Sequence, residues 1–318
     1  LNEKSWNKYL LWAAQLAFRM DRPVVLFPIA YHINRAPKLW TNPRVMRDVV
    51  KSRQESLDGN NTTFANAAMS IRLSAYPEQF IYSGVQTYYD VRQLSLQIRN
   101  GNHPLFCADS MMDVFAYSIG AFLSEILFIS NPENLFSRSK LFVFAGGTTF
   151  NTMQGTSRYI MDLNAFRSLL TLKRKKKLKQ IFHYLKSLNL PDFDKTWAGF
   201  YAMMYMGKGR KHRNDWLNRK SGDLWIAALK KDRVMPAKKI IKTYRRPDKE
   251  LQPRIDVIDF PYPYTHENPF PMSDMKNRDL IMRSLNLVIY KATVFFQLPV
   301  VEHMSKQHHT VSTKPLFA

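Results

Sequence analysis

The chain has 318 residues, 45% of them hydrophobic, which suits one large α/β domain with an insertion, or two domains. Its single cysteine, Cys107, excludes an intramolecular disulfide and a cysteine-based metal cluster. No run of ~18 uncharged apolar residues occurs, so no membrane span is predicted. Because the sequence begins with Leu1 and not methionine, we expect it to be a fragment or a trimmed form of a longer protein.

The chain is strongly basic, with 47 Lys and Arg against 25 Asp and Glu and a formal net charge of +22. Such an excess suits contact with nucleic acid, anionic lipid or acidic substrates. The basic residues are scattered and do not gather on one helix face. This favours a well-solvated enzyme surface over a nucleic-acid interface and leaves a membrane surface as an alternative. We expect a cytoplasmic protein.

The first hundred residues alternate helical and strand-like segments. Residues 6–19 predict a helix, and the β-branched run at 24–27 predicts a buried strand. His32 and Asn34 follow that strand at its carboxyl end, where open α/β sheets place their sites. We therefore name both as pocket candidates, with hydrogen-bonded scaffolding as the alternative for His32. Further helices are expected at 42–54, 64–74 and 84–100.

A strand, a sharp turn and a helix are predicted between residues 111 and 128. The turn carries Ser118 within A-x-S-x-G, a variant of G-x-S-x-G with Ala116 in place of the first glycine. Small residues are expected on both sides of the serine because strand and helix nearly touch there. The turn would raise the hydroxyl above the sheet and aim the Ile119 N–H at the developing oxyanion. Tyr117, inside the turn, is a pocket candidate.

The remaining chain predicts further strands separated by a segment of different character. A buried strand at 141–144 ends in two glycines, which permit close backbone approach or a positive φ, and no phosphate-loop motif follows. Residues 148–220 are helical, with a basic run at 173–177, and predict an inserted cap. Strands at 224–229 and 255–260 then accompany helices at 236–243 and 274–297. The predicted organisation is a core at 1–147 and 221–300, a cap at 148–220 and a flexible tail at 301–318.

Ser118, Asp232 and His266 each follow a predicted strand, in the chain order serine, acid, histidine. The acid follows the serine by 114 residues, and the histidine follows the acid by 34. Taken singly, each residue has a structural alternative: a turn serine, a helix N-cap and a turn histidine. Asp223 is an alternative acid, but it precedes its strand and would lie at the wrong end of the sheet.

On these motifs the chain resembles the α/β-hydrolase superfamily over about residues 1–300. The D-x-V-x-P segment of Asp232, Val234 and Pro236 resembles the family's acid loop, and the segments around His32 and His266 resemble an uncharacterised bacterial branch. The resemblance implies a mostly parallel sheet flanked by helices, with an inserted helical cap. The family's His-Gly oxyanion loop and first strands would precede Leu1, so Asn2 is a candidate second oxyanion donor.

The predicted function is a serine hydrolase acting on a small-molecule ester, thioester or amide. Ser118 would attack the carbonyl carbon, His266 would carry the proton, and Asp232 would orient the imidazole. Neither a metal nor an organic cofactor is expected. The alternative is a non-catalytic α/β-hydrolase-fold binding protein whose basic surface contacts anionic partners.

Overall fold

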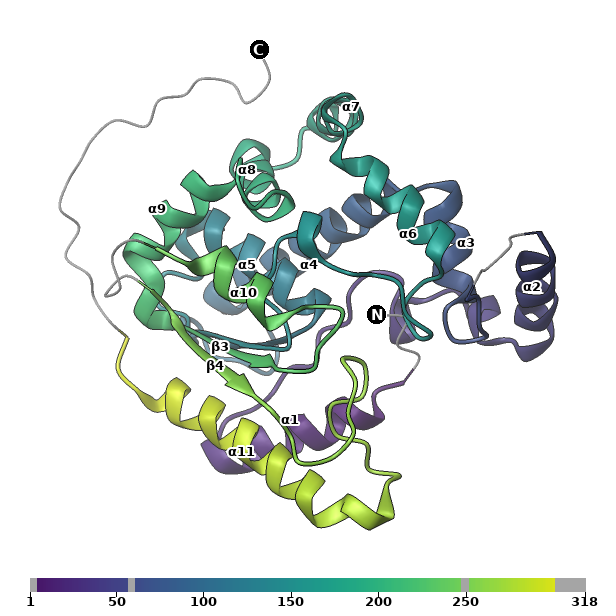
Figure 1. Ribbon diagram of the computed structural model, residues 1–318. Coiled ribbons are helices and arrows are strands. Elements are labelled where there is room, and N and C mark those ends of the chain that lie inside the picture. Colours follow the sequence, from purple (N-terminus) through teal and green to yellow (C-terminus); the bar gives the residue numbers. More distant parts are fainter. Residues whose placement is uncertain (1–4, 57–60, 247–251, 301–318) are drawn as a thin grey trace.

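The computed structural model describes residues 5–56, 61–246 and 252–300, and within them the chain forms an α/β fold (Figure 1). Four strands make one sheet in the order β1-β2-β3-β4, and all neighbouring pairs are parallel. The prediction of a parallel sheet flanked by helices is therefore confirmed. The strands are β1 (Val114–Tyr117), β2 (Leu141–Phe144), β3 (Leu224–Leu229) and β4 (Arg254–Ile258).

The two central strands, β2 and β3, are continuous apolar runs in the sequence because both of their faces are covered. Every residue of β2 and β3 is buried, as in parallel sheets with both faces covered. The two outer strands, β1 and β4, are partly exposed and less uniformly apolar.

The strands follow one another in space as in the chain, so right-handed crossovers place the connecting helices on one face of the sheet. That layer contains α5 (Ile119–Ser130), α8 (Phe193–Met204), α9 (Arg210–Lys220) and α10 (Ala237–Tyr244), whose buried side chains share one cluster. Gly199 lets α8 approach α5 closely, because a Cβ there would lie 2.8 Å from the carbonyl oxygen of Ile126.

The opposite face of the sheet is covered by helices that do not connect one strand to the next. It is covered by α1 (Asn7–Met20) and α11 (Arg278–Gln297), which lie side by side (Figure 1). Trp12 and Leu16 of α1 join the aromatic side chains of β2 and the apolar face of α11 in a second cluster. Lys140, directly before β2, donates to the carbonyls of Phe295 and Leu298 and so satisfies the end of α11.

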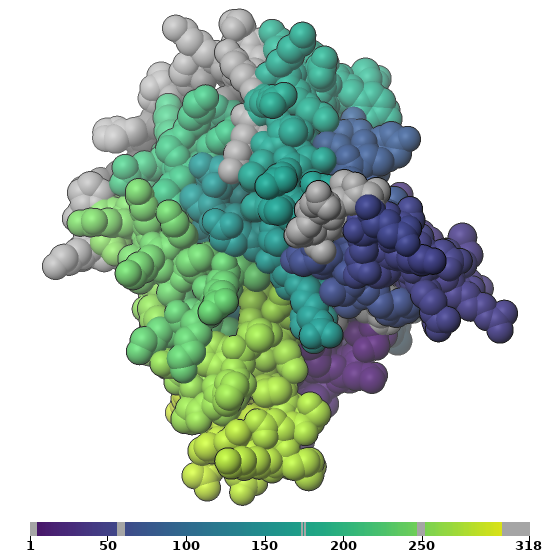
Figure 2. Space-filling view, turned by 45° about the vertical axis from the view of Figure 1, so that its right-hand side comes forward, coloured from purple at the N-terminus to yellow at the C-terminus, as the bar shows by residue number. Residues whose placement is uncertain are grey.

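The remaining helices lie on the α5 side or beyond it. They are α2 (Pro43–Ser56), α3 (Ala67–Ala75), α4 (Gln79–Arg99), α6 (Leu163–Leu170) and α7 (Lys175–Ser187). Helix α3 packs against α6, and α2 stands out from the body of the molecule with a small cluster around Met46 (Figures 1 and 2). Short 3-10 helices lie at Ile33–Arg35, Lys38–Thr41, Pro132–Asn134, Phe150–Thr152, Thr171–Lys173, Ser221–Asp223 and Met275–Asn277. Within the described residues, none of the helices is both long and apolar enough to cross a bilayer.

The predicted buried strand at 24–27 is wrong. The segment belongs to no strand, and Val24, Val25 and Phe27 are 40%, 45% and 37% exposed. A β-branched run becomes a strand only beside a hydrogen-bonding neighbour, and no strand of the described residues pairs with this one.

The range predicted as a cap is joined closely to the layer over the sheet. Helices α8 and α9 pack directly on α5, and Phe182 of α7 lies against Trp197 of α8 with ring centroids 5.4 Å apart. The boundaries at 148 and 220 stay a prediction. The predicted tail at 301–318 lies outside the described residues.

The helical layer over the sheet contains a fully buried carboxyl group. Glu125 of α5 accepts a hydrogen bond at Oε1 from the Tyr244 hydroxyl of α10, while its Oε2 makes no hydrogen bond within the described residues. Burial raises the pKa of Glu125 to about 8 against the opposing effects of the Tyr244 hydrogen bond and the Arg213 charge. Glu125 is therefore largely protonated at neutral pH.

Stability should fall as the pH rises because of Glu125. Its pKa is raised from 4.5 to about 8 on folding, so its stabilising effect is full below 4.5 and is lost as the pH approaches 8. Replacing Glu125 with Gln should leave the free energy of unfolding nearly unchanged at about pH 5 and raise it by a few kcal/mol at about pH 9.

Urea unfolding of wild type, E125Q and E55Q at several pH values checks this. Glu55 is exposed on α2, so E55Q is the matched control, in which the same change removes no buried carboxyl group. An E125Q difference that does not grow with pH would contradict a proton held by Glu125 in the folded state.

Candidate active site

Ser118 occupies a sharp turn between β1 and α5. Its backbone has φ 56° and ψ −123°, a conformation that L-residues rarely adopt. Its N–H still donates to the carbonyl of Phe144 at 3.2 Å, so the turn begins while the chain is bound to β2. The strand, the serine turn and the helix therefore follow one another as the sequence predicts.

The structure brings Ser118, His266 and Asp232 together in one hydrogen-bonded chain. Ser118 Oγ lies 2.6 Å from His266 Nε2, and His266 Nδ1 lies 2.6 Å from Asp232 Oδ2. All three side chains are at most 5% exposed. With Nδ1 donating to the carboxylate, Nε2 is the acceptor for the serine hydroxyl.

The two carboxylate oxygens of Asp232 have separate tasks. Oδ2 faces the histidine, whereas Oδ1 accepts the backbone N–H groups of Val234 and Met235, both at 2.8 Å. These backbone bonds fix the loop after β3 and prevent the carboxylate from rotating. Asp232 is not the N-cap of α10, where Pro236 stands. The alternative acid, Asp223, pairs with Lys220 at 2.8 Å before β3 begins.

The His266 loop is attached to three other parts of the fold. Tyr117 donates its hydroxyl proton to the carbonyl of His266, and its ring stacks on the imidazole at 5.8 Å between centroids. Lys8 of α1 donates to the carbonyl of Glu267 at 2.9 Å, and the Glu267 carboxylate accepts from the Ser157 hydroxyl. The imidazole is thus held from β1, from α1 and from the segment before α6.

The three predicted pocket residues have different positions. Tyr117 is buried behind His266, so it supports the histidine. Asn34 is exposed. His32 donates its Nδ1–H to the Ala30 carbonyl at 3.1 Å, and burial, the largest cause, lowers its pKa to about 3. This matches the scaffolding alternative for His32.

Of the two predicted oxyanion donors, one is placed. Ile119 is the first residue of α5, and its N–H follows the serine at the positive end of that helix, where no intrahelical acceptor exists. Asn2 lies outside the described residues.

The close approach at the turn is at Gly146 and not at Gly120. A Cβ on Gly146 would lie 2.4 Å from the Cβ of Ala121 and 3.2 Å from the carbonyl oxygen of Ser118, whereas one on Gly120 would meet nothing within 4 Å. The expectation of small residues on both sides of the serine is therefore wrong on the Gly120 side. The glycine pair after β2 shows both features that the sequence permits: Gly146 allows the close backbone approach, and Gly147 adopts a positive φ of 94°.

The described residues hold no group of three or more His, Cys, Asp or Glu side chains placed to bind a metal ion. The site consists of a hydroxyl, an imidazole and a carboxylate, with a backbone N–H at a helix N-terminus. Such a set supports nucleophilic and proton-transfer chemistry.

Residues 1–297 match a protein family described as "Family of unknown function (DUF6051)". The chain belongs to this family. Searches of curated proteins and of solved structures find no match.

The positive φ at position 118 strains any residue with a Cβ, so glycine there should be more stable than alanine. We expect S118G to be more stable than S118A by about 1–2 kcal/mol, since both lack the hydroxyl and only glycine tolerates this φ. Denaturant unfolding measures the difference. Inside α5, which follows this turn, the order should reverse, with S124G less stable than S124A by about 1 kcal/mol. A more stable S118A than S118G would contradict the strained turn.

Alanine at Gly146 should disturb the turn, while alanine at Gly120 should not. The G146A methyl collides with Ala121, which we expect to cost about 1–3 kcal/mol of stability. G120A adds a methyl group in open space and should be neutral or slightly stabilising, because Ala is the better helix former. Thermal unfolding of both variants tests this, and equal midpoints would contradict it.

Proposed function

We propose that this protein is a serine hydrolase that cleaves an ester, thioester or amide through Ser118, His266 and Asp232. The observation that supports this most strongly is the continuous chain of two 2.6 Å hydrogen bonds from Ser118 Oγ through His266 to Asp232 Oδ2. Short bonds on both sides of an imidazole are what general-base activation of a hydroxyl requires.

The reaction would begin when Ser118 Oγ attacks the carbonyl carbon and passes its proton to His266 Nε2. Asp232 stabilises the imidazolium, and the Ile119 N–H stabilises the oxyanion. His266 then gives its proton to the leaving oxygen, sulfur or nitrogen as the acyl bond breaks. Water attacks the acyl group with His266 again as base, which releases the acid and restores the hydroxyl.

The surroundings of the triad support this chemistry. Ser118 and His266 are each 2% exposed, so charges in the site act through a medium poor in water. Tyr117 and Lys8 hold the backbone around His266, which keeps the imidazole aimed at both partners.

An α/β-hydrolase-type fold is part of the proposal. It is supported by the parallel sheet, by the serine directly between β1 and α5, and by the acid and histidine that follow β3 and β4 in that order. The helices between β2 and β3 would then be the region that sets specificity.

A fluorophosphonate probe tests the proposal without knowledge of the substrate. We expect the wild-type protein to gain one covalent label, mapped by peptide mass spectrometry to Ser118, and S118A to gain none. A folded protein without labelling would contradict the proposal and would favour the non-catalytic binding protein.

Replacing Asp232 with Asn tests the role of the carboxylate more specifically than removing the side chain. In D232N the amide oxygen should stay at the Oδ1 position, where it accepts two backbone N–H groups, so the amide NH₂ faces His266 Nδ1. The imidazole is then forced into the tautomer with a proton on Nε2. We expect labelling to slow by about three to four orders of magnitude.

The matched control is D259N, which changes an exposed acid that binds the side chains of Lys230, Lys231 and Tyr264 and not the histidine. It should label at the wild-type rate. Equal labelling rates for D232N and wild type would show that the acid has no part in activating Ser118.

A further inference from the structure

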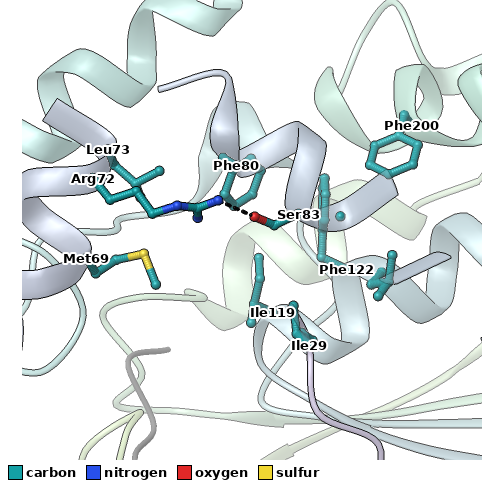
Figure 3. A pocket seen from close by; sticks show the side chains of 11 residues that line it. Ile29, Met69, Arg72, Leu73, Phe80, Ser83, Ile119, Phe122 and Phe200 are labelled. Carbon is teal, nitrogen blue, oxygen red and sulfur yellow. Dashed lines mark hydrogen bonds between the residues drawn. The ribbon is translucent and has the colours of Figure 1, made fainter. Parts of the chain in front are cut away.

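An apolar pocket with a single arginine lies beside the proposed nucleophile. It is a small, partly open cavity of about 50 Å³ between α3, α4, α5 and α8 (Figure 3). Ile119, whose N–H is the proposed oxyanion donor, forms part of its wall, so the pocket is one residue from Ser118. Other lining residues include Ile29, Met69, Leu73, Phe80, Phe122 and Phe200.

Arg72 is the charged side chain of this lining. It extends from α3 toward α4, where Nη2 donates to Ser83 Oγ at 2.8 Å (Figure 3). The same Nη2 donates to Gln79 Oε1 at 2.9 Å. The Tyr31 ring lies 3.7 Å from its Cζ. Its hydrogen bonds from Nη2 and this stacking fix the guanidinium plane at the edge of an apolar space.

Several partly buried arginines pair with a carboxylate, whereas the buried Arg213 is held by three backbone carbonyls. Arg35, Arg53 and Arg92 each pair with a carboxylate, at Asp90, Asp162 and Glu133. Arg72, by contrast, makes no ion pair with a carboxylate within the described residues; its partners there are neutral. A guanidinium among apolar side chains without a counter-ion carries an uncompensated desolvation cost.

Neighbouring groups do not supply the missing negative charge. Glu78, next to Gln79 in the chain, pairs with Lys177 at 3.5 Å. The remaining compensation must therefore come from a bound anion or from solvent.

We propose that this pocket binds the distal part of the substrate and that Arg72 receives an anionic group carried at the end of an apolar segment. A carboxylate or a phosphate has the geometry that the guanidinium fork recognises. The apolar wall between Ile119 and Arg72 would contact the segment that joins this group to the scissile bond. The inference rests on the proposed hydrolase function and specifies its substrate class.

Matched ester series test this proposal. One series pairs p-nitrophenyl monoesters of succinic, glutaric, adipic and suberic acid with p-nitrophenyl esters of unbranched monocarboxylic acids of equal length. A parallel series ends in phosphonate. Acetate esters of ω-hydroxy acids, compared with acetates of plain alcohols, place the anion on the leaving group instead. The quantity measured is kcat/KM for wild type, R72M, R72K and R47M.

We expect wild type to prefer an anion-ended ester over its neutral match by about tenfold or more at the chain length that fits. R72M should lose this preference, so that its kcat/KM values for an anion-ended ester and for the matched neutral ester become equal. R72K should retain part of it, and the preference should weaken with added salt. R47M removes an exposed positive charge outside the pocket lining and should behave as wild type.

Arg72 also joins α3 to α4, so a purely structural role must be distinguished. A structural role would lower the melting temperature and the rates on both ester types together, without changing their ratio. If R72M does not fold, R72Q and R72K provide the same ratio. Equal rates on anionic and neutral esters in wild type, or a preference that survives in R72M, would overturn the inference while Ser118-dependent hydrolysis stands. An absence of both labelling and hydrolysis would overturn the proposed function as well.

Discussion

The parallel alignment of β1, β3 and β4 is the constraint on which the candidate site depends. Parallel strands bring their carboxyl ends to one edge of the sheet, and Ser118, Asp232 and His266 all follow such ends. Residues separated by 148 and 34 positions in the chain thereby come within hydrogen-bond distance. A sheet with one strand reversed would send one of the three side chains to the opposite edge.

This arrangement lowers stability locally. Ser118 is held at a positive φ, Gly146 accepts contact with the turn that excludes even a methyl group, and Glu125 keeps a carboxyl group in the core two turns along α5. The dense aromatic packing around β2 and α11, with Phe142, Trp225 and Phe295 among its members, offsets these costs on the other face. Rigid elements on both sides of the sheet therefore support a strained turn, as functional sites commonly require.

The sequence carries a strong signal where burial alone decides the structure. β2 and β3 are continuous apolar runs, and both were predicted with the bounds that the structure has. The polar residues after β1, β3 and β4 were predicted to meet because parallel strands leave no other place for them. The run at 24–27 is also apolar, but no strand of the described residues pairs with it, and local propensity cannot distinguish the two cases.

Contacts between distant segments explain most of what the sequence left undetermined. Tyr117 holds a carbonyl 149 residues away and Lys8 holds one 259 residues away, and neither residue type signals such a role. Which glycine marks the close approach depends on the path of the loop after β2, so the sequence offered both Gly120 and the Gly146 pair, and only Gly146 makes the contact. Arg72 lies on a helix with ordinary periodicity, and the absence of a carboxylate partner within the described residues becomes visible only in three dimensions.

The most direct test of the central claim is proton NMR of the imidazole of His266. A short Nδ1–H hydrogen bond to Asp232 deshields this proton strongly, so a resonance far downfield of the backbone amides should appear in wild type. It should persist in S118A, which leaves the His–Asp bond intact, and disappear in D232N and H266N. If the folded wild-type protein lacks this resonance, or if D232N retains it, the linked serine–histidine–aspartate chain does not exist in solution and the proposed mechanism fails.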